Sequence, residues 1–292
     1  MQQIDELDPT TQATKTKSET TLRGPCPDNP PWGSWAAIGV WVASLVILGF
    51  FSVVFLLPYA SSQGLSPTDQ AQFPTFIKTD AMAVFLQFIG IIPAHLLTLA
   101  LAWFVVTRNR TYSFKEMLGW NWGGFTFLHA VLVTIFFYLV SIAAVSYFGD
   151  VENDFDIMLK SSKYIIYLVA FFAVFTAPIV EEVVYRGLLY SAFQRTVGKV
   201  FAVILVTVMF AGVHALQYSK DATPDYAVMS VLLLLSLLLT IIRVSTGNLL
   251  PCIVLHTVFN GFQSILMIAE PFLRPFMETT DPVVGAIRHL NW

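Results

Sequence analysis

Two carboxylates and a guanidinium stand close together in an apolar part of the chain. Glu181, Glu182 and Arg186 follow an apolar run that begins at Tyr164, and another apolar segment begins at Val200, so we expect all three at membrane depth. A charged group at the centre of a bilayer costs about 2.5–3.5 kcal/mol and normally faces a protein interior or a water-filled cavity. We infer that the protein uses these side chains.

Their spacing divides them into a pair and a single acid. Glu182 precedes Arg186 by four residues, the arrangement that favours an ion pair along one helix. Glu181 lies about 100° around the helix from Glu182, so it is left without that partner. We expect the pair to neutralise and orient itself while Glu181 points to the reacting centre. On a purely structural interpretation the three form a buried network, or they belong to a transport path.

Two histidines and an amide complete a candidate catalytic site. His256 and Asn260 are four residues apart, so both project from one helix face toward the same point. His214 ends another apolar segment, with Phe210 one turn before it. A further histidine, His95, lies in an apolar segment of its own; it could be a ligand in a pore or site, but we expect it to bond to a neighbouring helix.

These groups suit the hydrolysis of an amide bond. A Glu in an apolar setting can act as the general base on a water, and a His can share in positioning that water. A second His and an Asn amide can donate to the oxyanion of a tetrahedral intermediate. No Ser or Cys stands with a base in a triad-like pattern, so a covalent nucleophile is not favoured.

A zinc site is the chemical alternative. Glu181, His214 and His256 have the ligand types of a catalytic zinc. The helical His-Glu-x-x-His arrangement of many zinc proteases is absent from the sequence. The sequence therefore favours activation of water without a metal or another cofactor.

The composition defines the setting of this site. Of the 292 residues 56% are hydrophobic and only 12% are charged, with a mean hydropathy of +0.68. A soluble domain has about 25% charged residues. The apolar segments are long enough for membrane helices. We predict an all-α, polytopic membrane bundle of seven to eight transmembrane helices, and the net charge of −3 argues against a nucleic-acid partner.

The chain divides into a membrane domain and two tails. Residues 1–34 are polar and end in a Pro-rich stretch, so we expect a disordered tail there; residues 35–270 form the transmembrane domain and residues 271–292 a C-terminal tail. The long segment 164–195 contains Pro178, which predicts either one bent helix or two shorter ones. The predicted spans are residues 35–57, 81–106, 125–148, 164–195, 200–216, 226–242 and 248–269.

Lys and Arg near the ends of these spans predict the orientation. If the segment 164–195 crosses the membrane once, one side receives the basic loop around Arg108, the stretch from Arg195 to Lys199 and the turn at Arg243. The positive-inside rule then places the N-terminus in the cytoplasm, with seven spans. Splitting the long segment gives eight spans and moves the C-terminus to the cytoplasmic side.

Three motifs on successive predicted membrane helices resemble those of a known family. They are Glu181-Glu182-x-x-x-Arg186, Phe210-x-x-x-His214 and His256-x-x-x-Asn260. Their order is similar to that in the CaaX protease and bacteriocin-processing (CPBP) family, also called the type II CaaX prenyl endopeptidase or Abi family of intramembrane glutamic endopeptidases. The resemblance covers about residues 164–262.

The resemblance implies a role for each motif residue. Glu181 is the base that activates water, assisted by His214. His256 and Asn260 form the oxyanion pocket, and the ion pair predicted above supports the site. The family also implies a bundle of about eight membrane helices, with the site in a cavity that opens toward the cytoplasm.

The resemblance also bounds the substrate. Eukaryotic members trim the last three residues from prenylated CaaX proteins, whereas many prokaryotic members are tied to peptide maturation, bacteriocin immunity or unknown substrates. We predict a hydrolase of a prokaryotic inner membrane that cleaves a peptide bond of a membrane-associated peptide or protein, prenylated CaaX-type tails included, with membrane lipids as its surroundings. The alternatives are a non-catalytic scaffold or immunity protein that binds a peptide in the same cavity, and a transporter that uses both motif acids as a proton relay.

Overall fold

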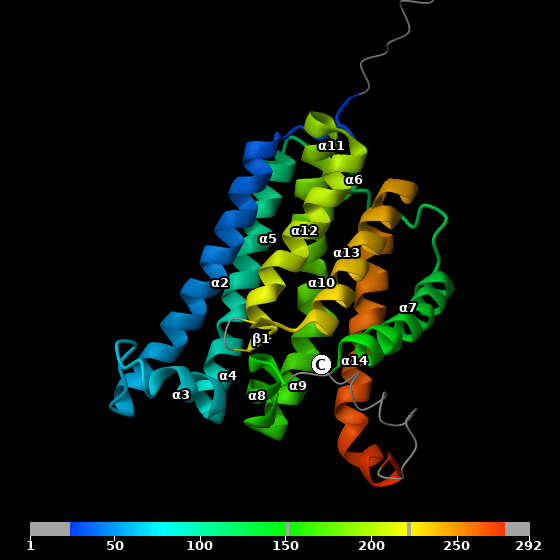
Figure 1. Ribbon diagram of the computed structural model, residues 1–292. Helices are drawn as coiled ribbons and strands as arrows, with labels where there is room; N and C mark the ends of the chain where they lie inside the picture. The colour runs from blue at the N-terminus through cyan, green and yellow to red at the C-terminus, as the bar shows by residue number, and fades with distance from the viewer. Residues whose placement is uncertain (1–23, 150–151, 221–222, 278–292) are drawn as a thin grey trace, which may run out of the picture.

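The protein is an all-α bundle, as predicted (Figure 1). The computed structural model describes residues 24–149, 152–220 and 223–277. Its elements are α2 (Ser34–Ser62), α3 (Phe73–Thr79), α4 (Ala81–Ile89), α5 (Ile91–Thr107), α6 (Phe114–Leu118), α7 (Phe127–Phe148), α8 (Asp154–Lys160), α9 (Lys163–Phe171), the π-helical segment η1 (Phe172–Thr176), α10 (Ala177–Glu182), a second π-helical segment η2 (Val183–Tyr190), α11 (Ser191–Val197), α12 (Lys199–Gln217), the strand pair β1 (Ser219–Lys220) and β2 (Thr223–Pro224), α13 (Tyr226–Thr246) and α14 (Leu250–Met277).

Six helical segments in the described part are long and apolar enough to cross a membrane. A seventh, the apolar part of α12, is shorter and spans Lys199–Ala215. Each predicted span corresponds to one of these seven segments, so the protein is an integral multi-pass membrane protein. The total of seven to eight spans stays a prediction.

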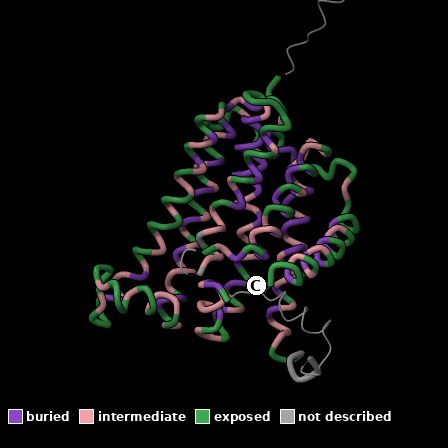
Figure 2. Tube along the Cα trace, in the orientation of Figure 1, coloured by how far each residue is buried: buried purple, intermediate pink, exposed green. Residues whose placement is uncertain are grey.

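The buried core lies among the later helices. In α13 half of the most apolar stretch is buried, whereas in α2 only 11% is. Figure 2 shows the buried residues gathered in the middle of the bundle, while α2 at its edge is largely exposed. Exposed side chains such as Phe50 on α2 and Phe136 on α7 give these helices an apolar outer surface, which suits contact with lipid.

One end of the bundle gathers basic residues, and we call it the basic end. The backbone N–H of Leu249 donates to the carbonyl of Gly119 over 2.8 Å, and the Arg195 guanidinium donates to the carbonyl of Pro30. These bonds join loops that are far apart in the sequence. The segments that form this end are residues 24–33, 108–124, 195–199 and 243–249.

Residues 24–33, which we expected within the disordered tail, pack against this end. Trp32 is 4% exposed, and its indole N–H donates to the carbonyl of Leu188 over 3.2 Å. The buried Arg243 pairs with Asp28, with 3.2 Å between Nη1 and Oδ1. The predicted tail of residues 1–34 therefore extends too far along the chain, because the Trp32 indole and the Asp28 carboxylate bind groups on helices distant in the sequence. The expected disorder of residues 1–23 falls outside the described residues.

The opposite end, which we call the hairpin end, is built around α3, α8 and the β1–β2 pair. Lys78 Nζ lies 2.6 Å from Asp154 Oδ2, which joins α3 to α8. Asn153 Nδ2 donates to Asp225 Oδ2 over 3.5 Å, which joins the start of α8 to the start of α13. α14 extends toward this end and continues to Met277, so the predicted C-terminal tail begins inside a helix; residues 278–292 lie outside the described residues.

The segment with the two motif acids is not a regular α-helix. Residues Lys163–Val197 form one long helical segment that widens into π-helix at η1 and again at η2. Pro178, near the start of α10, lacks an N–H and crowds the carbonyl four residues earlier, which a wide turn relieves. Both acids lie on the short α10 between the two π-helical segments. π-Helical turns inside α-helices frequently mark functional sites.

Candidate active site

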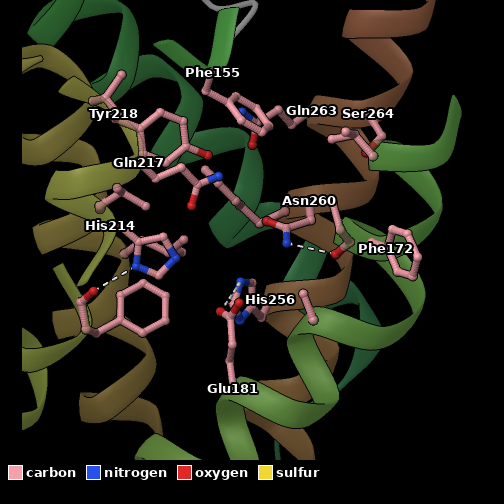
Figure 3. Close-up of a pocket in the computed structure, with 18 of the residues that line it drawn as sticks. Phe155, Phe172, Glu181, His214, Gln217, Tyr218, His256, Asn260, Gln263 and Ser264 are labelled. Atoms are coloured by element: carbon pink, nitrogen blue, oxygen red, sulfur yellow. Dashed lines mark hydrogen bonds and ion pairs between the residues drawn. The ribbon is translucent and has the colours of Figure 1, made fainter. Parts of the chain in front are cut away.

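All four predicted catalytic side chains line one cavity (Figure 3). Glu181, His214, His256 and Asn260 face a space of about 250 Å³. Its walls come from helices on both sides of the motif acids, and they include Phe155 of α8 and Gln217 and Tyr218 at the end of α12, so the cavity extends toward the hairpin end. The structure therefore brings together the three motifs that the sequence separates.

The predicted ion pair is present and completely buried. Arg186 Nη1 lies 2.9 Å from Glu182 Oε1, and both side chains are 0% exposed. A buried charge is tolerated where it is paired. Glu182 Oε1 carries the pair, and its Oε2 is a buried atom without a hydrogen-bond partner in the described part. The spacing of four residues within one helical segment was sufficient to predict this contact.

Arg186 is also held by α13, which sequence reasoning missed. Nη2 donates to the Ser236 carbonyl over 2.9 Å and to Ser236 Oγ over 2.8 Å, and Nε donates to Thr240 Oγ1 over 3.2 Å. The signal was present in the sequence, because these two hydroxyl residues are four apart on an otherwise Leu-rich helix. They fix the guanidinium and thereby the carboxylate of Glu182.

His256 stands between the two motif acids. Its Nδ1 lies 2.8 Å from Glu182 Oε1, and its Nε2 lies 3.9 Å from Glu181 Oε2. A carboxylate can only accept hydrogen bonds, so the hydrogen of the shorter contact belongs to Nδ1. The ring is thus oriented by Glu182 and presents Nε2 to Glu181 and the cavity.

Glu181 is the motif acid that reaches the cavity. Its side chain is 25% exposed, whereas that of Glu182 is 0% exposed. The 3.9 Å to His256 is too long for a direct hydrogen bond. Glu181 therefore faces the cavity, and its role as the base that activates a water stays a prediction.

His214 is oriented by its own helix and by Phe210. Its Nδ1 lies 2.7 Å from the Phe210 carbonyl, which can only accept, so Nδ1 donates and Nε2 remains for the cavity. The Phe210 ring lies 4.6 Å from the His214 ring and 6.1 Å from the His256 ring, measured between centroids. The guanidinium of Arg186 lies over the same ring at 4.8 Å. Phe210 therefore packs against both site histidines and the buried cation.

Asn260 is anchored to the first π-helical segment. Its Nδ2 donates to the carbonyl of Ala173 over 2.8 Å, and Figure 3 shows this bond beside the cavity. An Asn amide has two N–H donors, so one hydrogen remains for a ligand. A π-helical turn lies at this carbonyl, and no pattern in the sequence indicates it.

Three further predictions concern His95, the partner of Glu181 and a metal site. His95 bonds to a neighbouring helix, as predicted, with 3.0 Å between its Nδ1 and Thr176 Oγ1, and it also lines the cavity. The resemblance pairs Glu181 with His214, whereas the contact that the structure gives for Glu181 is with His256. In the described part, no three His, Cys, Asp or Glu side chains are grouped so that they could hold a metal ion.

Comparison with known families adds an independent finding. The family model described as type II CAAX prenyl endopeptidase Rce1-like matches residues 163–262, from the start of α9 to the middle of α14. This range contains all three motifs and nearly coincides with residues 164–262, where the sequence resembles the CaaX protease and bacteriocin-processing family. No curated protein and no solved structure matched the chain.

Proposed function

From the premise that residues 163–262 belong to the Rce1-like family, we propose that this protein is an intramembrane glutamic endopeptidase. Membership supports a membrane protease at the level of the family. The observation that supports the glutamate mechanism is the division between the acids: Glu182 is buried in an ion pair, while Glu181 lines the cavity within 3.9 Å of His256. The proposed substrate is a peptide bond of a membrane-associated peptide or protein, prenylated CaaX-type tails included.

In the proposed reaction Glu181 takes a proton from a water, and the water oxygen attacks the scissile carbonyl carbon. His214, whose Nδ1 is committed to a carbonyl, accepts a hydrogen bond from the same water at Nε2. The proton held by Glu181 then passes to the leaving nitrogen when the C–N bond breaks. General-base assistance of this kind contributes about 10²- to 10⁴-fold in rate.

The oxyanion is stabilised by the two polar groups of α14. His256 faces both acids, so in this proposal it acts in its doubly protonated form: Nδ1–H donates to Glu182 and Nε2–H donates to the oxyanion. Asn260 donates its second amide hydrogen. Removal of one oxyanion donor typically costs about 10²- to 10³-fold in kcat.

The test is cleavage of a quenched-fluorescent peptide library by the detergent-purified protein, with and without a farnesylated C-terminal cysteine. We expect Glu181→Gln to lower the cleavage rate by at least about 10²-fold. Glu116→Gln, a matched change on the exposed side of α6, should leave the rate unchanged. Equal unfolding temperatures of the three proteins show that folding is unaffected.

The outcome also separates the competing functions. A Glu181→Gln protein that cleaves at the wild-type rate contradicts the mechanism. Peptide binding that is equal in wild type and Glu181→Gln, without cleavage by either, supports the scaffold or immunity protein instead. Proton-coupled flux in liposomes would support the transporter.

A further inference from the structure

The polar face of α14 continues beyond the proposed oxyanion pair. Gln263 and Ser264 follow Asn260 by three and four residues, so they share its face, and both line the cavity. With a rise of 1.5 Å per residue, Gln263 lies about 10 Å along the helix axis from His256. A polar strip therefore leads from the reacting centre toward the hairpin end.

A second polar strip lies on α12. Gln217 follows His214 by three residues, and Tyr218 comes next; both line the cavity. Figure 3 shows His214 and Gln217 on the side of the cavity opposite Asn260 and Ser264. The amide side chains of Gln217 and Gln263 thus stand about one helix turn beyond the proposed catalytic groups, and neither belongs to the three motifs.

Amide side chains match the needs of a peptide backbone. Each amide has donors and an acceptor, which complement a peptide C=O and N–H. A backbone that enters a cavity away from bulk water must keep these groups hydrogen-bonded. An extended peptide advances about 3.3–3.6 Å per residue, so a strip of about 10 Å accompanies roughly three residues beside the scissile bond.

The remaining wall of this part of the cavity suits apolar side chains. Phe155, Phe172 and Met267 are each less than 9% exposed and line it. A membrane helix satisfies its backbone groups internally, so it must unwind locally before another group can bind them. Backbone-binding amides stabilise such an unwound segment.

We propose that Gln217 and Gln263 form a subsite that binds the backbone of an extended, apolar peptide segment beside the scissile bond. The inference rests on the proposed peptidase function. It identifies the substrate as an extended segment that is recognised through its main chain.

The test compares amide and ester substrates. The probe is the library peptide that binds most tightly to the Glu181→Gln protein, made in versions with one backbone amide at a time replaced by an ester. We expect the ester at a contacted position to raise the wild-type KM about fivefold with little change in kcat. Gln217→Leu and Gln263→Leu, which keep the side-chain size, should raise KM on the amide peptide by a similar factor and lose sensitivity to the ester. Gln63→Leu, at an exposed position just after α2, is the matched control and should behave as wild type.

Binding is measured in parallel so that the two proposals can fail separately. Fluorescence anisotropy on the Glu181→Gln background reports peptide affinity without cleavage. A peptide affinity that Gln217→Leu weakens about fivefold supports the subsite, whether or not the wild type cleaves the peptide. Absence of cleavage by the wild type contradicts only the peptidase function. Equal ester sensitivity in wild type and both Leu variants, or peptide binding that neither variant weakens, overturns the subsite. Binding of no library peptide overturns it as well.

Discussion

His256 Nδ1 lies 2.8 Å from Glu182 Oε1, the same oxygen that accepts from Arg186 Nη1 at 2.9 Å. A single buried carboxylate oxygen thus joins the first motif to the third. The ion pair is therefore more than a neutralised charge, because it fixes the histidine ring whose other nitrogen faces Glu181. The stability of the fold and the proposed catalysis therefore rest on the same contact.

Loss of the Glu182 carboxylate should destabilise the protein strongly. Glu182→Gln leaves the Arg186 cation at 0% exposure without a counter-charge, which typically costs about 3–5 kcal/mol. Thermal unfolding in detergent measures this cost. The double variant Glu182→Gln/Arg186→Met removes the stranded charge and should recover part of the loss. A single variant as stable as wild type contradicts the prediction.

Asn260 should affect kcat more than KM. Asn260→Ala removes a proposed oxyanion donor, and we expect kcat to fall about 10²- to 10³-fold. The change also removes the bond to the Ala173 carbonyl, so the unfolding temperature is measured beside the kinetics. Unchanged kcat in a folded variant would remove Asn260 from the mechanism.

Chelators should leave cleavage unchanged. In the described part no three His, Cys, Asp or Glu side chains are grouped to hold a metal ion, and the proposed mechanism uses none. Activity is measured after dialysis against 1,10-phenanthroline and EDTA, with a zinc protease in the same detergent as the control. Loss of activity that zinc restores would establish the zinc alternative.

The contact between α2 and the α4–α5 junction depends on a glycine. A Cβ on Gly90 would lie 2.8 Å from the backbone carbon and oxygen of Phe51, so the two helices would have to separate. We expect Gly90→Ala to lower the unfolding temperature. Gly39→Ala on α2 is the matched control, because its Cβ meets nothing within 4 Å and Ala favours a helix by about 1 kcal/mol. Equal unfolding temperatures in both variants would show that the close approach is unimportant.

The sequence predicted the parts of the site that depend on spacing within one helix. The Glu182–Arg186 pair and the shared face of His256 and Asn260 needed only a helical period, and long apolar runs were sufficient for the membrane helices. It did not predict contacts that depend on how helices meet. Ser236 binds Arg186 across a gap of 50 residues, and the burial of Trp32 depends on a carbonyl 156 residues away. The π-helical turns beside α10 depend on local strain that a simple period does not describe.

The cavity extends from the middle of the bundle toward the hairpin end, away from the basic end, and this links two predictions about orientation in the membrane. Charge counting puts the basic end in the cytoplasm, while the resemblance to the CaaX protease and bacteriocin-processing family puts the mouth of the cavity there. A mouth at the hairpin end would place the two predictions in conflict. With Cys26 and Cys252 replaced by Ser, we introduce one cysteine at a time, Gln217→Cys or Lys115→Cys, and label it on intact cells with a membrane-impermeant maleimide, which decides more than topology. It tells whether the substrate arrives as a newly made cytoplasmic chain or as one that has already been exported.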